Sequence, residues 1–225
     1  MILVTGASRG IGLGIASRFT SLGFDVVGLA RTSVAAPFPT FEVDVTDDEQ
    51  VRQVALDLRR AKTFPTVVIN AAGIASMNLA LMTPASKARA VVGTNLLGTM
   101  FVCQAFAPLI ARAGGGSIIN FSTIAVALGL SGESVYAASK AGVETYTRVL
   151  ARELAGMNIR ANCIAPGPID TELLRGVSDS QIDAIVKQQI LPTRFTVEDI
   201  CDVAEALVDK RLSSISGEVF HIGGV

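Results

Sequence analysis

The sequence is poor in the residues on which several common chemistries depend. Its 225 residues include one histidine and three cysteines. The single histidine, His221, falls in an apolar run near the C-terminus, which argues against a Ser-His-Asp hydrolase and favours a structural role. Cys103, Cys163 and Cys201 are scattered, odd in number and without metal-ligand spacing. This pattern predicts a reduced, cytoplasmic protein without a metal site.

Charge is also scarce, and its pattern excludes two classes of partner. Only 17% of the residues are charged, the net charge is −1 and no basic run occurs, so nucleic acid and anionic membrane surfaces are poor candidates. No uninterrupted apolar run reaches the ~18 residues of a membrane span. The apolar start lies directly before Thr5-Gly6, so we expect a first strand there and not a signal peptide. A nucleophile elbow, a Walker loop and a His-x-x-x-His motif are absent.

Short apolar runs are abundant, since half of the residues are hydrophobic. They alternate with helical patterns, and this alternation predicts βαβ units and a parallel sheet covered on both faces. We therefore predict an α/β fold, with one domain over residues 1–225 and a doubly wound, mostly parallel seven-stranded sheet of the Rossmann type. The predicted strands are 2–5, 25–29, 40–43, 66–69, 117–121, 160–164 and 219–222, and the clearest helices are 47–60, 85–112 and 136–155. Residues 30–39 leave room only for a loop.

A glycine-rich turn follows the first predicted strand. After it, Ile11, Ile15, Phe19 and Leu22 recur with helical spacing, so the segment is a strand, a turn and a helix. The backbone N–H groups and the helix N-terminus form a site for a pyrophosphate. The spacing is G-x-x-x-G-x-G and not the commoner G-x-G-x-x-G. The candidate cofactor-binding residues here are Gly6, Ser8, Arg9, Gly10, Ile11 and Gly12.

Tyr136 and Lys140 form the second informative pattern. Residues four apart on a helix share a face, and a nearby ammonium favours the phenolate form of a tyrosine. At roughly 4 Å the attraction is about 4 kcal/mol at an intermediate dielectric, so we expect Lys140 to lower the pKa of Tyr136. Taken alone, the pair also fits a solvated helix face.

Together, the glycine-rich turn and the Tyr136/Lys140 pair resemble the short-chain dehydrogenase/reductase family over essentially the whole chain. Within that family, the sequence most resembles the 3-oxoacyl-carrier-protein reductases. Six further stretches support the resemblance in the family's order: Asp44-Val45, Asn70-Ala71-Ala72-Gly73, Asn95, Ser122-Thr123, 166–171 and the closing 216–224.

The resemblance implies catalytic roles. Tyr136 would be the general acid or base, and Lys140 would lower its pKa and hold the nicotinamide ribose. The family places a serine thirteen positions before the tyrosine, which is Thr123 in this sequence, with Ser122 as the alternative. Strand alternation lets only one of these two hydroxyls face the substrate. Asn95 would help to hold a water leading to the lysine, or it is a satisfied buried amide.

The resemblance also implies the cofactor. The second strand ends at Ala30, where NAD-dependent members carry Asp, and Arg31 follows at once. Together with Arg9, this favours NADP, unless Arg31 is a solvated loop charge. Asp44 would accept from the adenine amino group or belong to the N-cap region of the next helix, and Val45 would pack on the ring. The remaining candidates are Asn70, Ala71 and Gly73 near the adenine ribose, Pro166, Gly167 and Ile169 at the nicotinamide, and Thr171 at a phosphate.

We therefore expect an NADP(H)-dependent oxidoreductase that interconverts a carbonyl and an alcohol, with a 3-oxoacyl thioester as one possible substrate among several. The alternatives are a non-catalytic NADP-sensing regulator and an NAD-dependent alcohol or sugar dehydrogenase. We also expect a homotetramer. In the predicted helix 85–112, apolar residues occupy more of the helix circumference than one core-facing stripe needs. In the helix 136–155, Tyr146 and Val149 point away from the side that faces the sheet, and a monomer would expose such apolar surface. The C-terminal strand would form a second interface.

Overall fold

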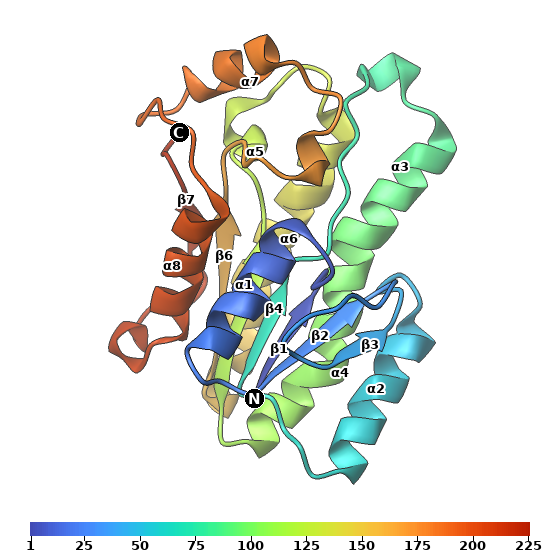
Figure 1. Cartoon of the computed structure of the whole chain (residues 1–225), viewed down its shortest axis with the longest axis vertical. Coiled ribbons are helices and arrows are strands. Elements are labelled where there is room, and N and C mark those ends of the chain that lie inside the picture. The colour runs from blue at the N-terminus through green and yellow to red at the C-terminus, as the bar shows by residue number, and fades with distance from the viewer.

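All seven strands lie in one sheet and run parallel. The computed structural model describes residues 1–225, and its sheet has the order β3-β2-β1-β4-β5-β6-β7 (Figure 1). The chain moves outward from β1 to β3 and then returns to β4, so the order reverses between β1 and β4. Ligands of such sheets bind at the carboxyl ends of the strands beside this reversal. The strands are β1 (Ile2–Thr5), β2 (Val26–Ala30), β3 (Thr40–Glu42), β4 (Val67–Asn70), β5 (Gly116–Phe121), β6 (Ile159–Ala165) and β7 (Val219–His221).

The predicted fold class and the number of strands are confirmed, and the strand boundaries agree within one or two residues. The predicted sheet was mostly parallel, and the structure has no antiparallel pair. The central strands are buried along their whole length because helices cover both faces of the sheet. The connection between β2 and β3 has no helix, as predicted, and Phe38 anchors it in the core at 6% exposure.

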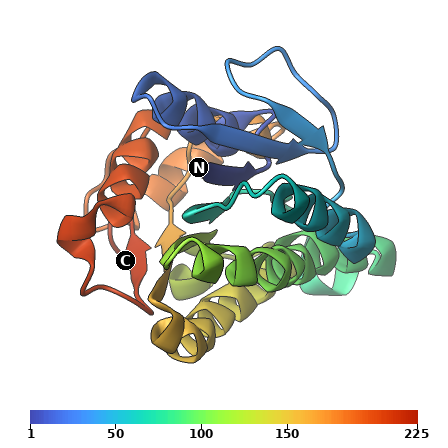
Figure 2. The same cartoon turned by 90° about the horizontal axis from the view of Figure 1, so that it is seen from below.

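Helices cover the two faces unequally, as the view from below in Figure 2 shows. The helices α1 (Gly10–Ser21) and α8 (Val197–Val208) pack on one face, with Ile15, Phe19 and Ile200 in its core. On the other face lie α2 (Asp48–Arg60), α4 (Gly98–Arg112) and α6 (Ser134–Leu154). Two separate apolar cores, one on each face, therefore hold the sheet in place.

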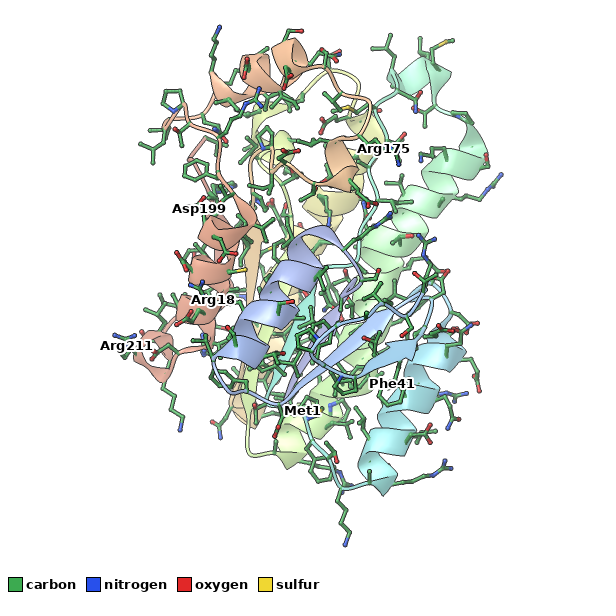
Figure 3. All side chains as sticks on the ribbon, in the orientation of Figure 1. Met1, Arg18, Phe41, Arg175, Asp199 and Arg211 are labelled. Atoms are coloured by element: carbon green, nitrogen blue, oxygen red, sulfur yellow. The ribbon has the colours of Figure 1, made fainter.

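The contact between α1 and α8 depends on a glycine and a charge cluster. A Cβ at Gly14 would lie 2.2 Å from Val197 Cγ1, so only glycine allows this approach without a shift. Arg18 on α1 forms ion pairs with three acids along α8, namely Glu198, Asp202 and Glu205. Figure 3 shows Arg18 on the side of α1 that faces α8.

Three helices were not predicted from apolar periodicity: the four-residue α5 (Ala125–Leu128) and two longer helices whose start signals the sequence carries. Helix α7 (Asp179–Val186) begins with a capping box between Ser178 and Gln181. Helix α8 begins with one between Thr196 and Asp199. A capping box pairs a side chain before the helix with one in its first turn, so it is visible in the sequence at fixed spacing.

The predicted helix 85–112 is continuous but changes its winding. It consists of α3 (Ala85–Val92), a π-helical turn (Gly93–Leu97) and α4. By length and composition alone this helix could cross a membrane, since its most apolar window has a mean hydropathy of 1.5. In the fold it packs against α2, α6 and the sheet, and Val102, Phe106 and Ile110 on it are fully buried. Core helices of this kind meet the same two criteria.

Candidate active site

A cavity of about 860 Å³ lies at the carboxyl ends of the strands. Its walls come from the glycine-rich loop, the ends of β2, β4 and β5, the first turns of α6, and the segment after β6. In Figure 1 the segment that carries α7 lies beyond the upper ends of the strands, on this side of the sheet. The predicted residues that line the cavity are Gly6, Ser8, Arg9, Gly10, Ile11, Gly12, Arg31, Asp44, Val45, Ala71, Gly73, Ser122, Thr123, Tyr136, Lys140, Pro166, Gly167, Ile169 and Thr171.

The glycine-rich loop is shaped for a close backbone approach. Gly6 has a φ of +67°, and a Cβ there would lie 2.8 Å from the Ala72 Cα. A Cβ at Gly12 would lie 2.3 Å from the Gly6 carbonyl oxygen. The backbone N–H groups of residues 8–12 donate to no other backbone group, and no side chain caps α1. Unpaired N–H groups at a helix start suit an anion, so the residues present fit a dinucleotide pyrophosphate.

Tyr136 is buried at 8% exposure in the first turn of α6 and lies beside the Thr123 hydroxyl. Burial raises the pKa of Tyr136 above its ordinary value, the negative charge of Glu133 raises it further, and the neighbouring Thr123 hydroxyl lowers it. A phenol in this state keeps its proton at neutral pH. Tyr136 can therefore serve as a proton donor to an oxygen that enters the cavity.

Lys140 lies one turn after Tyr136, and its amine donates a 2.8 Å hydrogen bond to the Phe121 carbonyl oxygen. Burial lowers the pKa of Lys140 to about 8. We expected Lys140 to lower the pKa of Tyr136, and in this structure that expectation is wrong, because the pKa of Tyr136 is raised and Lys140 is not among its causes. The ammonium is directed at the end of β5, and desolvation is the larger effect on both side chains.

The structure separates the two hydroxyls that follow β5. Ser122 donates a 2.6 Å hydrogen bond to the Glu144 carboxylate, whereas the Thr123 hydroxyl lies beside Tyr136 and accepts from Ala125 N–H at 3.3 Å. The two side chains point in different directions, as strand alternation predicts. Thr123 is therefore the hydroxyl beside the proton donor, and the hydroxyl of Ser122 is already engaged in a buried contact with α6.

Two predicted residues, Asn95 and Asn70, do not line the cavity. Asn95 is fully buried in the π-helical turn, where its amide bonds both the N–H and the carbonyl of Ile74 and donates to Ser139. The satisfied-amide alternative is thus the arrangement observed, and Asn95 braces the loop after β4. Asn70 donates to Asn120 on β5, which in turn donates to Thr147 on α6, so this chain of amides ties the sheet to the helix.

Of the two arginines proposed to bind the cofactor, one is ion-paired within the chain and the other is not. Arg9 forms a 2.7 Å ion pair with Glu172, and both side chains are more than half exposed. The exposed Arg31 lines the cavity without an ion pair. An exposed ion pair contributes about 0–1 kcal/mol, so Arg9 can exchange Glu172 for a phosphate at small cost.

Asp44 lies at the turn before α2. Its carboxylate accepts hydrogen bonds from the N–H and the hydroxyl of Thr46, at 2.9 and 2.8 Å. The N-cap of α2 is Asp47 and not Asp44. Asp44 therefore shapes the turn that brings Val45 to the cavity wall. Asp44 also lines the cavity itself.

The segment after β6 closes one side of the cavity. A Cβ at Gly10 would lie 3.5 Å from Thr171, so this segment runs beside the glycine-rich loop. A Cβ at Gly167 would lie 2.0 Å from Gln189 Oε1, so the Gln189 side chain packs directly against this turn. Ile169 pairs with Phe195 in a short parallel bridge. These contacts fix the position of the segment relative to the sheet.

The prediction from sequence missed several residues of the cavity wall. Two of them are acids: Glu172, which pairs with Arg9, and Glu133, which precedes α6 and is only 7% exposed. The place of Glu133 three positions before Tyr136 puts it on the same side of the helix start, which the spacing alone could have indicated. The apolar residues missed include Ile74, Ala75, Met77, Ile124, Leu130, Leu173, Leu174 and Ile185.

Comparison with known proteins assigns the fold and the site to one family. A family model described as Enoyl-(Acyl carrier protein) reductase, of the short-chain dehydrogenase/reductase type, matches residues 6–224. The chain belongs to the short-chain dehydrogenase/reductase family. This family consists of oxidoreductases, and the resemblance stated from the sequence is confirmed.

Curated relatives and solved structures of this family cover the whole length of the chain. The 3-oxoacyl-[acyl-carrier-protein] reductase FabG of Pseudomonas aeruginosa is 33% identical, over 99% of this chain and 95% of its own length. That of Chlamydia pneumoniae is 32% identical over the same shares. Among solved structures, Thermoplasma acidophilum aldohexose dehydrogenase has a TM-score of 0.90 and 26% identity, covering 99% of this chain and 92% of that one. A 4-hydroxyisoleucine dehydrogenase complexed with NADH has a TM-score of 0.89 and 27% identity, covering 99% and 97%.

Proposed function

We propose that this protein is an NADP(H)-dependent oxidoreductase that interconverts a carbonyl and an alcohol. The observation that carries the proposal is that Tyr136 and Thr123 lie side by side in the same cavity as the open N–H groups of the glycine-rich loop. Family membership supports a nicotinamide dinucleotide as the cofactor. The preference for NADP and the roles of single residues are parts of the proposal.

The chain's own residues supply the proton and hold the reacting oxygen. Thr123 donates a hydrogen bond to the carbonyl oxygen, and Tyr136 transfers its proton to the same oxygen as the alcohol forms. When bound, the nicotinamide supplies the hydride in this direction and accepts it in the reverse direction. Lys140, protonated below about pH 8 and directed at the Phe121 carbonyl, holds the nicotinamide ribose. Asn95 holds the loop after β4 at the cavity, beside Gly73.

The residues proposed for the dinucleotide follow the cavity wall from one end to the other. The open N–H groups of residues 8–12 bind the pyrophosphate, and Thr171 assists from the opposite segment. Arg31, free of ion pairs, binds the 2′-phosphate, and Arg9 joins it by leaving Glu172. Asp44 and Val45 form the wall beside the adenine. Ala71 and Gly73 bring the backbone close to the adenine ribose. Pro166, Gly167 and Ile169 form the wall at the nicotinamide end.

A cofactor and substrate panel tests the proposal. Purified protein is assayed with NADPH and with NADH against simple ketones, hydroxy ketones, keto-sugars, quinones and 3-oxoacyl thioesters, by loss of absorbance of the reduced cofactor. The proposal expects turnover of at least one carbonyl class, with NADPH used more efficiently than NADH. Absence of turnover with every class, although NADPH binds in a direct titration, would instead favour the NADP-sensing regulator.

A further inference from the structure

Glu133 has no role in the proposed reaction, although it is a titratable side chain inside the cavity. It lies directly before α6, three residues before Tyr136, and its backbone carbonyl accepts from Ala137 N–H at 2.7 Å, so the start of the helix holds it in place. The residue is 7% exposed and lines the cavity. Its carboxylate forms neither a hydrogen bond nor an ion pair within the chain, and burial alone raises its pKa.

Such an arrangement is costly for the fold. A carboxylate that is largely withdrawn from water and has no partner loses part of its hydration and gains no hydrogen bond in return. Polar groups that are buried in proteins nearly always have a hydrogen-bond partner. No side chain of the cavity wall donates to Glu133, and the Lys140 amine is directed at the Phe121 carbonyl instead. A ligand that brings its own donor would complete the site.

The position of the carboxylate relative to the reacting centre is also informative. Glu133 is near enough to Tyr136 for its charge to act on the phenol. A donor that reaches Glu133 therefore lies on a carbon close to the carbonyl that Tyr136 protonates. An anionic substituent at that position would be repelled by the carboxylate, and a purely hydrocarbon one would leave it unpaired.

The donor is better matched by a hydroxyl than by an ammonium group. Lys140 already places a cation in the same cavity at neutral pH, and a second ammonium would be repelled by it and would have to lose a strongly bound hydration shell. A hydroxyl loses less hydration and donates one hydrogen bond to the carboxylate.

We infer that Glu133 binds a hydroxyl group of the substrate, and that the substrate class is a neutral hydroxy ketone or hydroxy aldehyde, or the corresponding diol in the oxidative direction. This inference rests on the proposed function and narrows it. It assigns Glu133 as a specificity-determining residue, and it disfavours 3-oxoacyl thioesters, whose carbons next to the reacting carbonyl carry no donor.

A matched pair of ketones tests the inference. 2-Hydroxycyclohexanone and 2-methylcyclohexanone differ by a hydroxyl in place of a methyl group, and kcat/KM is measured for both with the preferred cofactor. Since a hydrogen bond to a charged group is lost with the methyl compound, we expect the unmodified protein to prefer the hydroxy ketone ~10- to 100-fold. In Glu133→Leu the ratio should fall close to one, and in Glu133→Gln, which keeps the shape and an acceptor, it should fall less. Any effect of Glu133 on Tyr136 cancels in the ratio.

Two controls complete the design. Glu153→Gln removes an exposed acid of the same helix and should leave the ratio unchanged. Calorimetric titration of both ketones into Tyr136→Phe and into Tyr136→Phe/Glu133→Leu measures binding without turnover. If the hydroxy ketone binds better only when Glu133 is present, the inference about Glu133 holds. If the unmodified protein in addition reduces neither ketone, the proposed function fails while the inference about hydroxyl binding stands.

Three results would overturn the inference. The first is a ratio near one in the unmodified protein. The second is a preference that survives in Glu133→Leu. The third is turnover of acetoacetyl-coenzyme A that exceeds that of the hydroxy ketone and does not respond to Glu133→Leu.

Discussion

The Ser122 hydroxyl donates a 2.6 Å hydrogen bond to the Glu144 carboxylate, and both side chains are buried. This contact ties the end of β5 to α6, the helix that also carries Tyr136 and Lys140. The same short stretch of β5 provides the Phe121 carbonyl that accepts from Lys140. The register between strand and helix thus determines where the proton donor and its hydroxyl partner meet.

The first prediction concerns the two hydroxyls. Thr123→Ala should lower kcat by about 10²–10³, because it removes a positioned donor to the reacting oxygen. Ser122→Ala should change kcat less and should instead destabilise the protein by about 1–3 kcal/mol, because Glu144 loses its buried partner. Steady-state kinetics and chemical denaturation of both variants measure the two effects. The opposite ranking in kcat would transfer the catalytic role to Ser122.

The second prediction concerns the proton donor. Tyr136→Phe should abolish turnover while NADPH still binds, since the phenol supplies the proton and holds little of the cofactor. Lys140→Ala should impair both steps, because the ammonium is proposed to hold the nicotinamide ribose, on whose position the hydride transfer depends. Single-turnover kinetics together with fluorescence titration of NADPH separate binding from chemistry. Near-normal kcat in Tyr136→Phe would remove Tyr136 from the mechanism.

The third prediction links the lowered pKa of Lys140 to stability. Burial lowers this pKa from 10.5 to about 8, so the protonated amine costs about 3 kcal/mol of stability at neutral pH. Lys140→Met removes that cost and loses a hydrogen bond worth about 1 kcal/mol. The variant should therefore be more stable at pH 7, by about 1–2 kcal/mol, although it is inactive.

The sign with pH follows from the two states. Between about pH 8 and 10.5 the unfolded chain binds the proton and the folded chain does not, so the unmodified protein gains stability as pH rises. The gain in stability from Lys140→Met should thus be largest below pH 8 and should decrease as the pH rises toward 10.5. Urea denaturation without cofactor at pH 7 and pH 10 measures it, with exposed Lys187→Met as the control. A difference that does not vary with pH would contradict the burial argument.

The fourth prediction concerns cofactor choice. Arg31→Ala should raise the KM for NADPH and leave the KM for NADH nearly unchanged, because only NADPH carries the 2′-phosphate. Glu172→Gln releases Arg9 from its ion pair and should lower the KM for NADPH. Initial-rate kinetics with both cofactors measure these changes. Equal efficiency with NADPH and NADH in the unmodified protein would refute the preference.

The fifth prediction is a homotetramer. An apolar groove between α6 and the helix 85–112 is lined by Leu96, Met100, Ala141, Gly142, Thr145, Tyr146 and Val149. Val149 is 48% exposed, and Ile190 and Leu191, beside the C-terminal Gly224, are 70% and 59% exposed. Soluble monomers rarely leave such patches open, so Val149→Asp and truncation of the C-terminal strand should each lower the assembly state.

Light scattering during size-exclusion chromatography measures this assembly. Arg152→Asp, an exposed change on the same helix, serves as the matched control and should leave the mass unchanged. A mass near 23.4 kDa for the unmodified protein at micromolar concentration would refute the homotetramer.

The sequence by itself determined the fold class and the location of the site, because both depend on local patterns. Alternating strand and helix patterns predict a parallel sheet, and such a sheet brings the carboxyl ends of its strands to one edge. The glycine-rich turn and the spacing of Tyr136 and Lys140 lie each within one or two elements, so their geometry follows from the 3.6-residue turn and the strand-to-helix connection.

Only the tertiary structure decided the properties that depend on burial and on distant partners. The sequence predicts a Tyr136 whose pKa is lowered by Lys140, but burial and the charge of Glu133 raise that pKa, and Lys140 is not among its causes. The ion pair of Arg9 with Glu172 and the bond of Ser122 with Glu144 join residues far apart in the chain. Glu133 is an ordinary acid in the sequence, and only the fold places it, largely buried and without a partner, in the wall of the cavity. Desolvation and long-range contacts are sums over the whole fold, and no local spacing encodes them.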